Sequence, residues 1–465
     1  MSATSSTPSI APENARTVML PLKKLEKCSV CQKTDGLRLC SACGEKVYCG
    51  SECQTNDWAE HKKQCGKTDR INLSSFYPLL ACMLAAPHLD PDKPKHPALT
   101  HKILNEPNPS NRHGVCGFPD GYQSRLVVLG DSCDPSLIWS NLEAWWPTAE
   151  SPKVRGKLFQ RFLYEGYLLP HLVSMCFALL AEMYTTTSGP GKRRIRLQYS
   201  SSPIADFGIV KGAVEVKNQD KFSYFLADEQ KFMHGQNPED HYWVYFTTIR
   251  GEEVLLECGM FVFNFCTMVG NLDPYLKHGL PPLDAVPAHL VNREFRRLAP
   301  SLHYEKERFS VLRDVELGEA VRCSREYLRP QDSRAIVGFM EKVAGRTCSA
   351  VEKEITLSWC MHLCEVLHAN LEAQEYRNFP LNPSLAIFDD PGELDFDTPE
   401  EDEQWFRYMV KWNRKQRRGE ITAEQLGQVF RAYKEAPDNV REELARHPSR
   451  ALNLRRSRRD INKRM

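Results

Sequence analysis

Apolar side chains recur every three or four residues over 158–180, which is the spacing of one face of a helix. Pro170 interrupts this pattern, so two helices are expected with a break at that position. Further along, Ser349 and Glu352 have the form of a capping box, and the apolar positions after them predict a helix reaching about His368.

Between these helices the pattern changes to that of strands. Residues 195–199 (IRLQY) alternate apolar and polar side chains, as a strand with one buried face does. Residues 242–249 (YWVYFTTI) are β-branched or aromatic on both faces, which is typical of a central strand, and 254–263 (VLLECGMFVF) are expected to form its hairpin partner. Region 119–385 is therefore predicted to be an α+β domain of unknown function.

The last part of the chain, 386–465, is predicted to be a charged helical segment. Capping signals begin one helix at Pro399 and another at Thr422. An acidic run covers 389–403, and the last sixteen residues carry seven Lys or Arg side chains. Most such runs are solvated surface, and a nuclear-import element is the alternative for the basic end.

The beginning of the chain divides into three parts. Residues 1–22 are rich in Ser, Thr, Pro and Ala and are expected to be a disordered tail, because they lack the apolar core of a secretion signal. A cysteine-rich segment occupies 23–67. Six prolines between 84 and 112 predict that 68–118 is an irregular connector.

Composition narrows the class of protein. The chain has 465 residues, 42% of them hydrophobic, so it can bury sizeable cores in more than one domain. Its formal charge of +1 gives no overall field toward nucleic acid or anionic lipid, and neither partner is expected. The most apolar stretches, 158–184 and 254–269, are interrupted or short, so no membrane span is expected. Seventeen cysteines without an export signal indicate an intracellular protein, cytoplasmic or nuclear.

Seven of the cysteines lie between 28 and 65, together with one histidine. They form four pairs with the spacing of metal ligands, which favours two tetrahedral zinc sites over buried structural thiols. Spacing alone leaves open which pairs share an ion. Four protein ligands at each site leave no position for an activated water, so both ions are expected to be structural. The pairs are Cys28 with Cys31, Cys40 with Cys43, Cys49 with Cys53, and His61 with Cys65.

This run of pairs, with Tyr48, Gln54 and Asp57-Trp58 around the last two, closely resembles the MYND zinc finger over about 28–65. The resemblance implies a treble or cross-braced two-zinc finger with interleaved sites, ahead of the larger α+β domain and the helical C-terminal segment. One site would hold Cys28, Cys31, Cys49 and Cys53, and the other Cys40, Cys43, His61 and Cys65.

The resemblance also implies a function in protein–protein interaction. MYND fingers bind short proline-containing peptides of partner proteins, so an adaptor or regulatory protein is expected. At the matching positions, Gln54 is the candidate contact for a peptide backbone and Trp58 the candidate wall for a proline or aliphatic side chain. Inward packing of Trp58 over the ligands is the alternative. A further hypothesis places residues 8–12 (PSIAP) in the chain's own groove.

An enzyme is the competing class, with an active site dispersed over 119–385. MYND fingers also occur inside SET-domain lysine methyltransferases, but only 27 residues precede Cys28 here, and NFCT at 264–267 lacks the histidine of that family's cofactor motif. Cys360, Cys364 and His368 share one helix face, and the apolar surroundings favour core packing over metal binding. The sequence gives neither the partner nor the oligomeric state.

Overall fold

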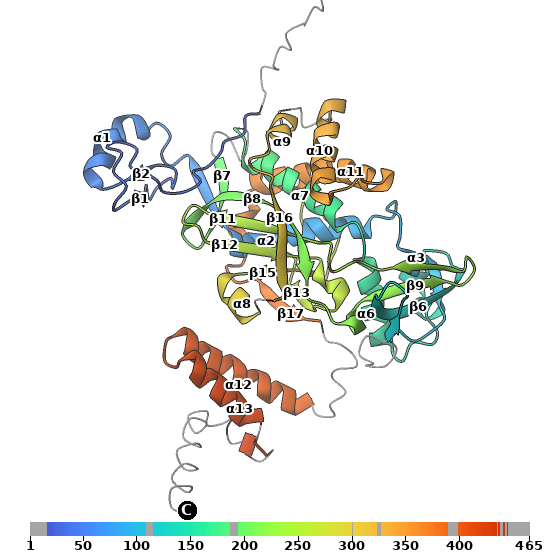
Figure 1. Ribbon diagram of the computed structural model, residues 1–465. Coiled ribbons are helices and arrows are strands. Elements are labelled where there is room, and N and C mark those ends of the chain that lie inside the picture. The colour runs from blue at the N-terminus through green and yellow to red at the C-terminus, as the bar shows by residue number, and fades with distance from the viewer. Residues whose placement is uncertain are drawn as a thin grey trace, which may run out of the picture. The chain divides into compact units, whose positions relative to one another are not determined.

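The computed structural model describes residues 16–107, 115–186, 194–299, 301–322, 327–388, 399–434, 436–437, 440–441 and 444. The chain divides into two compact units at residue 392. The first unit contains the cysteine-rich segment and a large mixed α/β body (Figure 1). The second contains two helices with a small core of their own.

A seven-stranded sheet forms the centre of the α/β body. Its order is β15-β12-β11-β8-β7-β3, and β16 pairs with β8 outside this path. All pairs are antiparallel except β3 with β7. The strands are β3 (Thr68–Asn72), β7 (Arg194–Tyr199), β8 (Ser202–Val214), β11 (His241–Thr248), β12 (Glu253–Glu257), β15 (His289–Val291) and β16 (His303–Ser310).

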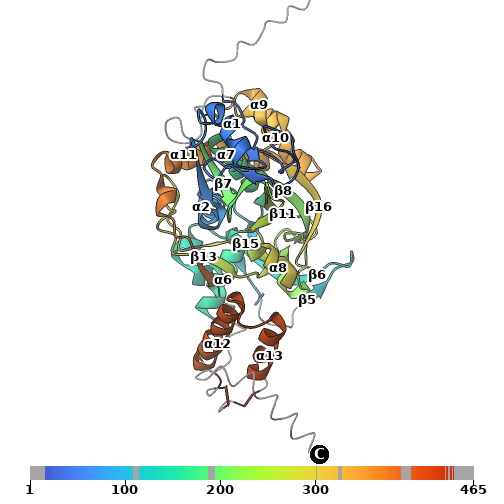
Figure 2. The same cartoon turned by 90° about the vertical axis from the view of Figure 1, so that its left-hand side faces the viewer.

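Two apolar helices, α2 (Leu73–Ala85) and α7 (Leu168–Met183), cover one side of this sheet, and α11 (Ala350–Glu372) packs on α7. Figure 2 shows them together on one side of strands β8 and β11. Every residue of α7 after Leu168 is buried, because the helix packs against the sheet and against α11. Three further helices lie in the later part of the body: α8 (Arg293–Leu298), α9 (Val315–Ala320) and α10 (Pro330–Ala344).

The prediction of an irregular connector over 68–118 is wrong. Strand β3 pairs with β7 in the central sheet, and all residues of α2 except Ser74 are buried. The described prolines that suggested a connector all follow α2, and Asn72 caps this helix by accepting a hydrogen bond from the Ser74 N–H at 3.0 Å. Apolar residues between 71 and 86 therefore belong to the core of the body.

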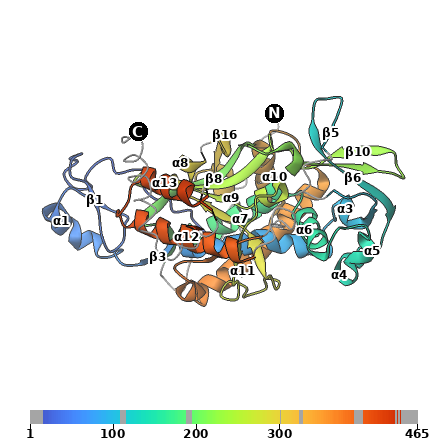
Figure 3. The same cartoon turned by 90° about the horizontal axis from the view of Figure 1, so that it is seen from below.

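A second sheet stands at the far end of the body from the cysteine-rich segment (Figure 3). Its order is β10-β9-β6-β4, with β5 pairing to β6, and its core contains Trp145, Trp146 and Phe162. A three-stranded sheet has the order β14-β13-β17, and its strand β13 contacts β15 of the central sheet. These elements are α3 (Pro97–Thr100), β4 (His101–Ile103), β5 (Val115–Gly117), β6 (Gln123–Ser132), α4 (Leu137–Ser140), α5 (Leu142–Trp145), α6 (Pro152–Leu163), β9 (Phe222–Leu226), β10 (Lys231–His234), β13 (Thr267–Gly270), β14 (Ala285–Pro287) and β17 (Ser384–Ile387).

The helix pattern over 158–180 is confirmed, but the break is not at Pro170. Helix α6 ends at Leu163 and α7 begins at Leu168, with Tyr167 at φ +58° between them. Pro170 is the third residue of α7, where a backbone N–H has no partner within the helix to lose. No single described helix is long and apolar enough to cross a membrane; α6 and α7 reach that standard only as a pair, bent by 64°.

The strand predictions are confirmed in part. Residues 195–199 lie in β7, and 242–248 lie in β11, whose hairpin partner is β12. The partner is shorter than expected because the chain turns after Glu257. The buried Glu257 carboxylate accepts hydrogen bonds from the backbone N–H of Gly259 at 2.7 Å and of Met260 at 3.1 Å, and a 3-10 helix follows over Met260–Phe263.

The capping predictions agree with the structure. Ser349 and Glu352 exchange hydrogen bonds at the start of α11, which extends to Glu372. In the second unit, α12 (Pro399–Arg417) and α13 (Ala423–Lys434) pack through Tyr408, Trp412 and other apolar side chains. The acidic run is described only from residue 399, and the basic end lies outside the described residues.

The segment before the cysteines also differs from its prediction. Val18 forms a bridge with Thr185, and the Met19 N–H donates to the Tyr184 carbonyl oxygen at 2.8 Å. Arg16 pairs with the buried Glu182 at 2.8 Å. The disordered tail expected over 1–22 is therefore wrong for 16–22, which pack on the body. Residues 8–12, of the self-ligand hypothesis, lie outside the described residues.

Candidate metal centre

A short hairpin and one helix position the eight donors between 28 and 65. Strands β1 (Arg38–Leu39) and β2 (Val47–Tyr48) are antiparallel, and helix α1 (Ser51–His61) follows them. The CxxC pairs sit in tight turns closed by backbone hydrogen bonds, such as Gly44 N–H to the Cys40 carbonyl oxygen at 2.8 Å. Gly44 has φ +62°, a conformation that a residue with a side chain rarely adopts, and it lets the chain reverse after Cys43.

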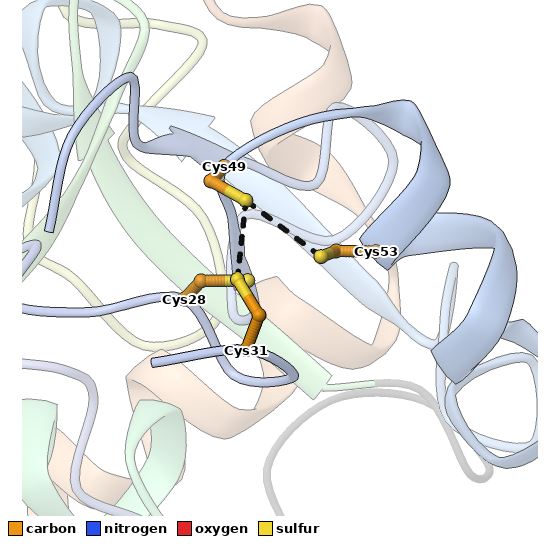
Figure 4. A group of neighbouring side chains, drawn as sticks. All are labelled: Cys28, Cys31, Cys49 and Cys53. Atoms are coloured by element: carbon orange, nitrogen blue, oxygen red, sulfur yellow. Dashed lines mark hydrogen bonds between the residues drawn. The ribbon is translucent and has the colours of Figure 1, made fainter. Parts of the chain in front are cut away.

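The first cluster joins the first CxxC turn to the start of α1 (Figure 4). The Cys31 and Cys49 sulfurs lie 3.4 Å apart, and the Cys49 and Cys53 sulfurs 3.6 Å apart. Cys28 completes the set, with all four sulfurs within 4.8 Å of one another.

The second cluster joins the other CxxC turn to the end of α1. The Cys40 and Cys65 sulfurs lie 3.7 Å apart, and the Cys43 sulfur is 3.4 Å from His61 Nε2. These four donor atoms also lie within 4.8 Å of one another. The two clusters are the interleaved sets that the resemblance implies. The first CxxC turn shares a cluster with residues at the start of α1, and the second CxxC turn shares one with residues at its end.

Both donor sets fit zinc. Zn–S bonds of about 2.3 Å and Zn–N bonds of about 2.0 Å place neighbouring donors of a tetrahedral site roughly 3.5 to 3.8 Å apart. The observed separations of 3.4 to 3.7 Å match this spacing. Four thiolates, or three thiolates and one imidazole, are typical of closed structural zinc sites, so the chemistry expected here is structural support.

The protein environment prepares one thiol in each cluster for ionisation. Burial acts to raise the pKa of Cys28, but hydrogen bonds from the backbone N–H groups of Cys31 and Val30 outweigh it and lower the pKa to about 6. The same balance lowers the pKa of Cys40 to about 7. Burial raises the pKa of Cys43 to about 12, and a divalent cation bound to the sulfur would favour the thiolate and act in the opposite direction.

Asp57 ties helix α1 to the hairpin. Its carboxylate accepts a hydrogen bond from the Tyr48 hydroxyl at 2.7 Å and pairs with Lys46 at 3.1 Å. The hydrogen bond from Tyr48 is the main reason why the pKa of Asp57 is lowered. In the sequence Asp57 is marked only as part of the motif, and the structure shows that its carboxylate connects α1 to the hairpin.

The two candidate peptide contacts lie on α1. The Trp58 side chain is 45% exposed, and its ring contacts the edge of the His61 ring at a centroid distance of 6.0 Å. Gln54 is half-buried, with Nε2 at 3.7 Å from the Cys40 sulfur. Trp58 thus supports a ligand on one side and presents a free apolar surface on the other.

Contacts with the body hold the segment in place. Arg70 on β3 donates to the Cys43 carbonyl oxygen at 2.8 Å, and Glu45 accepts from Arg194 on β7 at 3.1 Å and from the Thr68 hydroxyl at 2.9 Å. No sequence signal marked these residues, because they lie far apart along the chain.

Of the three residues that share a face of α11, Cys360, Cys364 and His368, the two cysteines are buried in the core, as expected from their apolar surroundings. Burial raises the pKa of Cys360 to about 12.

Comparison with known proteins gives the same assignment for this segment. Residues 28–65 match the family described as the MYND finger. The chain is also similar to the histone-lysine N-methyltransferase ASHR1 of Arabidopsis thaliana, with 42% identity over 45 residues. That stretch covers 10% of this chain and 9% of the relative's length. No solved structure matches the chain.

The chain therefore contains a MYND finger with two structural zinc sites, followed by an α/β body that no comparison recognises. The stretch shared with the methyltransferase is about as long as the finger alone. Methyltransferase activity is therefore a property of that relative alone, and the similarity does not reach most of the α/β body of this chain.

Proposed function

We propose that this protein is an adaptor or regulatory protein that uses its MYND finger to bind short proline-containing peptides of partner proteins. The eight cysteine and histidine residues of the two clusters are proposed as the zinc ligands. Gln54 and Trp58 are proposed as the peptide contacts. The proposed partners are intracellular proteins, which agrees with the absence of any disulfide among the described cysteines.

The exposed side chain of Trp58 is the observation that carries the proposal. A large aromatic side chain that is 45% exposed, on a helix braced by two metal sites, is a rigid surface for a proline ring. Since both clusters have a full set of protein donors, binding is the favoured role for the finger and hydrolysis at zinc is not.

The hairpin beside Trp58 supports an extended ligand. Ser29 covers the outer side of β2, because its N–H donates to the Val47 carbonyl oxygen at 2.8 Å and its hydroxyl accepts from the Val47 N–H at 3.4 Å. Among the described strands, none pairs with the outer side of β1. Since both backbone groups of Val47 are bonded to Ser29, its register partner Leu39 turns its own N–H and carbonyl to the outer side of β1, where an extended peptide can add by backbone hydrogen bonds.

Peptide titration of two tryptophan variants tests the proposal. Trp58→Ala is expected to weaken binding of a PxLxP peptide by roughly 10-fold or more, the loss typical of an aromatic anchor. Trp139→Ala is the matched control, because Trp139 is 56% exposed on α4, away from the finger. Equal affinity of the two variants, each with two bound zinc ions, would reject the peptide contact.

The alternative function, methyl transfer by the α/β body, has a separate test. Full-length protein is incubated with S-adenosylmethionine and histone peptides, and methyl incorporation is measured. The adaptor proposal expects no incorporation, in the wild type or in Trp58→Ala. Incorporation that survives Trp58→Ala would place an enzyme in the body and remove the proposal that the finger is the functional part.

A further inference from the structure

A cavity of about 230 Å³ lies where three parts of the first unit meet. Residues 19–22 before the finger line one side, and residues 44–46 with His61 of the finger line another. The edge of the central sheet, with β3 and β7, closes the third side. A ligand in this cavity contacts the N-terminal segment, the finger and the body at once.

Three arginines from two adjacent strands line the cavity. Arg70 and Arg196 are register partners in the parallel pair β3–β7, and Arg194 lies two residues before Arg196 on the same face of β7. Lys46 adds a fourth cation, and Glu45 is the one carboxylate among the residues that line the cavity. The lining is therefore strongly positive in a protein whose overall formal charge is +1.

The carboxylates nearby neutralise only part of this charge. Glu45 lies 3.1 Å from Arg194 and 3.7 Å from Arg70, and it is shared between them. Lys46 pairs with Asp57 at 3.1 Å, outside the cavity lining. Clustered guanidinium groups repel one another, so an oxyanion among them would lower the electrostatic energy of the folded protein.

Arg70 also has a donor in need of a partner. Its side chain is 14% exposed and Nη2 donates to the Cys43 carbonyl oxygen at 2.8 Å, but the buried Nε has no hydrogen-bond acceptor. Gly44 keeps this side open, since a Cβ there would lie 3.6 Å from Nε and 3.0 Å from the Pro203 ring. An oxygen of a bound anion would satisfy the N–H that the protein leaves unpaired.

We propose that this cavity binds a small phosphate-bearing ligand, which fastens the MYND finger to the α/β body. A phosphate monoester carries about −1.5 to −2 charges at pH 7 and several acceptor oxygens, which suits a cavity where Arg70 and Arg194 share one carboxylate and the Arg196 guanidinium donates to the Ile195 and Thr185 carbonyl oxygens. Typical pockets for larger ligands measure about 300–1,000 Å³, so this smaller cavity suits a small metabolite and excludes a folded partner. Trp58, the proposed peptide contact, does not line the cavity.

Calorimetric titration of zinc-loaded, full-length protein tests the proposal. The probes are glycerol phosphate and inorganic phosphate, with succinate as a dianion that carries carboxylates in place of phosphate, all at one fixed ionic strength. Saturable one-to-one binding of the phosphate probes, tighter than that of succinate, is the expected result. Succinate binding as tightly as glycerol phosphate, or no saturable phosphate binding, would overturn the assignment.

Three variants locate the site. Arg70→Gln is expected to weaken glycerol phosphate binding by roughly 10- to 100-fold, the usual loss for a charge-assisted contact. Glu45→Gln removes the competing carboxylate and is expected to tighten binding several-fold. Arg297→Gln removes the same charge from an exposed position on α8 and is expected to leave affinity unchanged.

The test stays decisive because Arg70→Gln and Glu45→Gln are expected to change the affinity for glycerol phosphate in opposite directions. Zinc content is measured for each variant, so a loss of affinity through unfolding of the finger is recognised. If Arg70→Gln loses its zinc, Glu45→Gln alone decides the result, and unchanged or weaker binding in that variant rejects the site. Trp58→Ala is expected to keep full phosphate affinity, so failure of the peptide proposal and failure of this one are distinguishable.

Discussion

The MYND finger and the α/β body solve the same physical problem by different means. Ordering a residue costs about 1–2 kcal/mol of backbone entropy, and the body offsets this by burying whole helices such as α7, where every residue after Leu168 is buried. The finger buries little besides Tyr48 and its own ligands. Stability in the finger is therefore a property of the metal sites, and stability in the body is a property of packing.

Removing one proposed zinc ligand is expected to have the largest effect on the stability of the finger. Cys49→Ala is expected to release metal and unfold the finger, since a structural zinc site contributes on the order of 10 kcal/mol to folding. Zinc content and limited proteolysis of full-length protein measure the effect, and the body is expected to stay folded. Cys133→Ala, a half-buried cysteine outside both clusters, is the control. Two zinc equivalents retained by Cys49→Ala would contradict the ligand assignment.

A buried carboxylate in the body offers the next largest effect. Glu257 lies 3.1 Å from His241 and 2.8 Å from His303, and although burial acts to raise its pKa, these histidines and their hydrogen bonds lower it well below the usual value. A depressed pKa gives stability that is present above the unfolded-state pKa, near 4.3, and is lost as pH falls below it. Glu257→Gln is expected to cost about 3–5 kcal/mol at pH 7.

Chemical denaturation from pH 7 down to pH 3.5 measures this dependence. It is done in the Cys49→Ala background, so that loss of zinc in acid does not contribute. The difference in unfolding free energy between proteins with and without the Glu257→Gln substitution is expected to shrink as the pH falls. A difference that stays constant with pH would show that the carboxylate charge is not involved.

A mutation that creates a cavity in the core of the body tests whether the finger and the body fold separately. Leu179 on α7 is fully buried, and Leu179→Ala is expected to cost about 2–5 kcal/mol. The finger is expected to keep two zinc ions, because its sites do not depend on this packing. Denaturant midpoints and metal content are measured on the same samples, and loss of zinc on mutation of Leu179 would show that the two regions do not fold separately.

The smallest expected effect is inside the finger. Asp57→Asn weakens the charge-assisted hydrogen bond from Tyr48 and the ion pair with Lys46, for a cost of about 1–3 kcal/mol. Since the pKa of Asp57 is lowered, its contribution is present above the unfolded-state value and declines in acid. Competition with a zinc chelator measures the change. Lys63→Gln, which alters an exposed ion pair with Glu60, is the control with no expected effect.

The finger was predictable from sequence as a MYND finger with two clusters of cysteine and histidine donors. The chemistry needs specific residue types at short spacings, and each pair lies within one turn of loop or helix, so the local sequence encodes it. The sequence did not tell whether Trp58 faces outward, because its exposure depends on how α1 packs on the hairpin.

The body was predictable only as a set of elements. The patterns gave β7, β11 and the capping box at Ser349, but the prolines between 84 and 112 concealed the role of β3 and α2. Proline frequency reports where a chain turns, and it carries no information on which neighbouring segments are buried. Burial of α2 depends on helix α7 and strand β14, which are remote in sequence.

The sequence by itself determined that this protein carries two closed metal sites, because the spacing of eight donors over 28–65 is a local property of the chain. Only the tertiary structure decided how that finger joins the body. Arg194 meets Glu45 across 149 positions of sequence, and Arg70 meets the Cys43 carbonyl oxygen across 27. These contacts exist because β3 and β7 pair side by side, and strand pairing depends on the packing of the whole sheet.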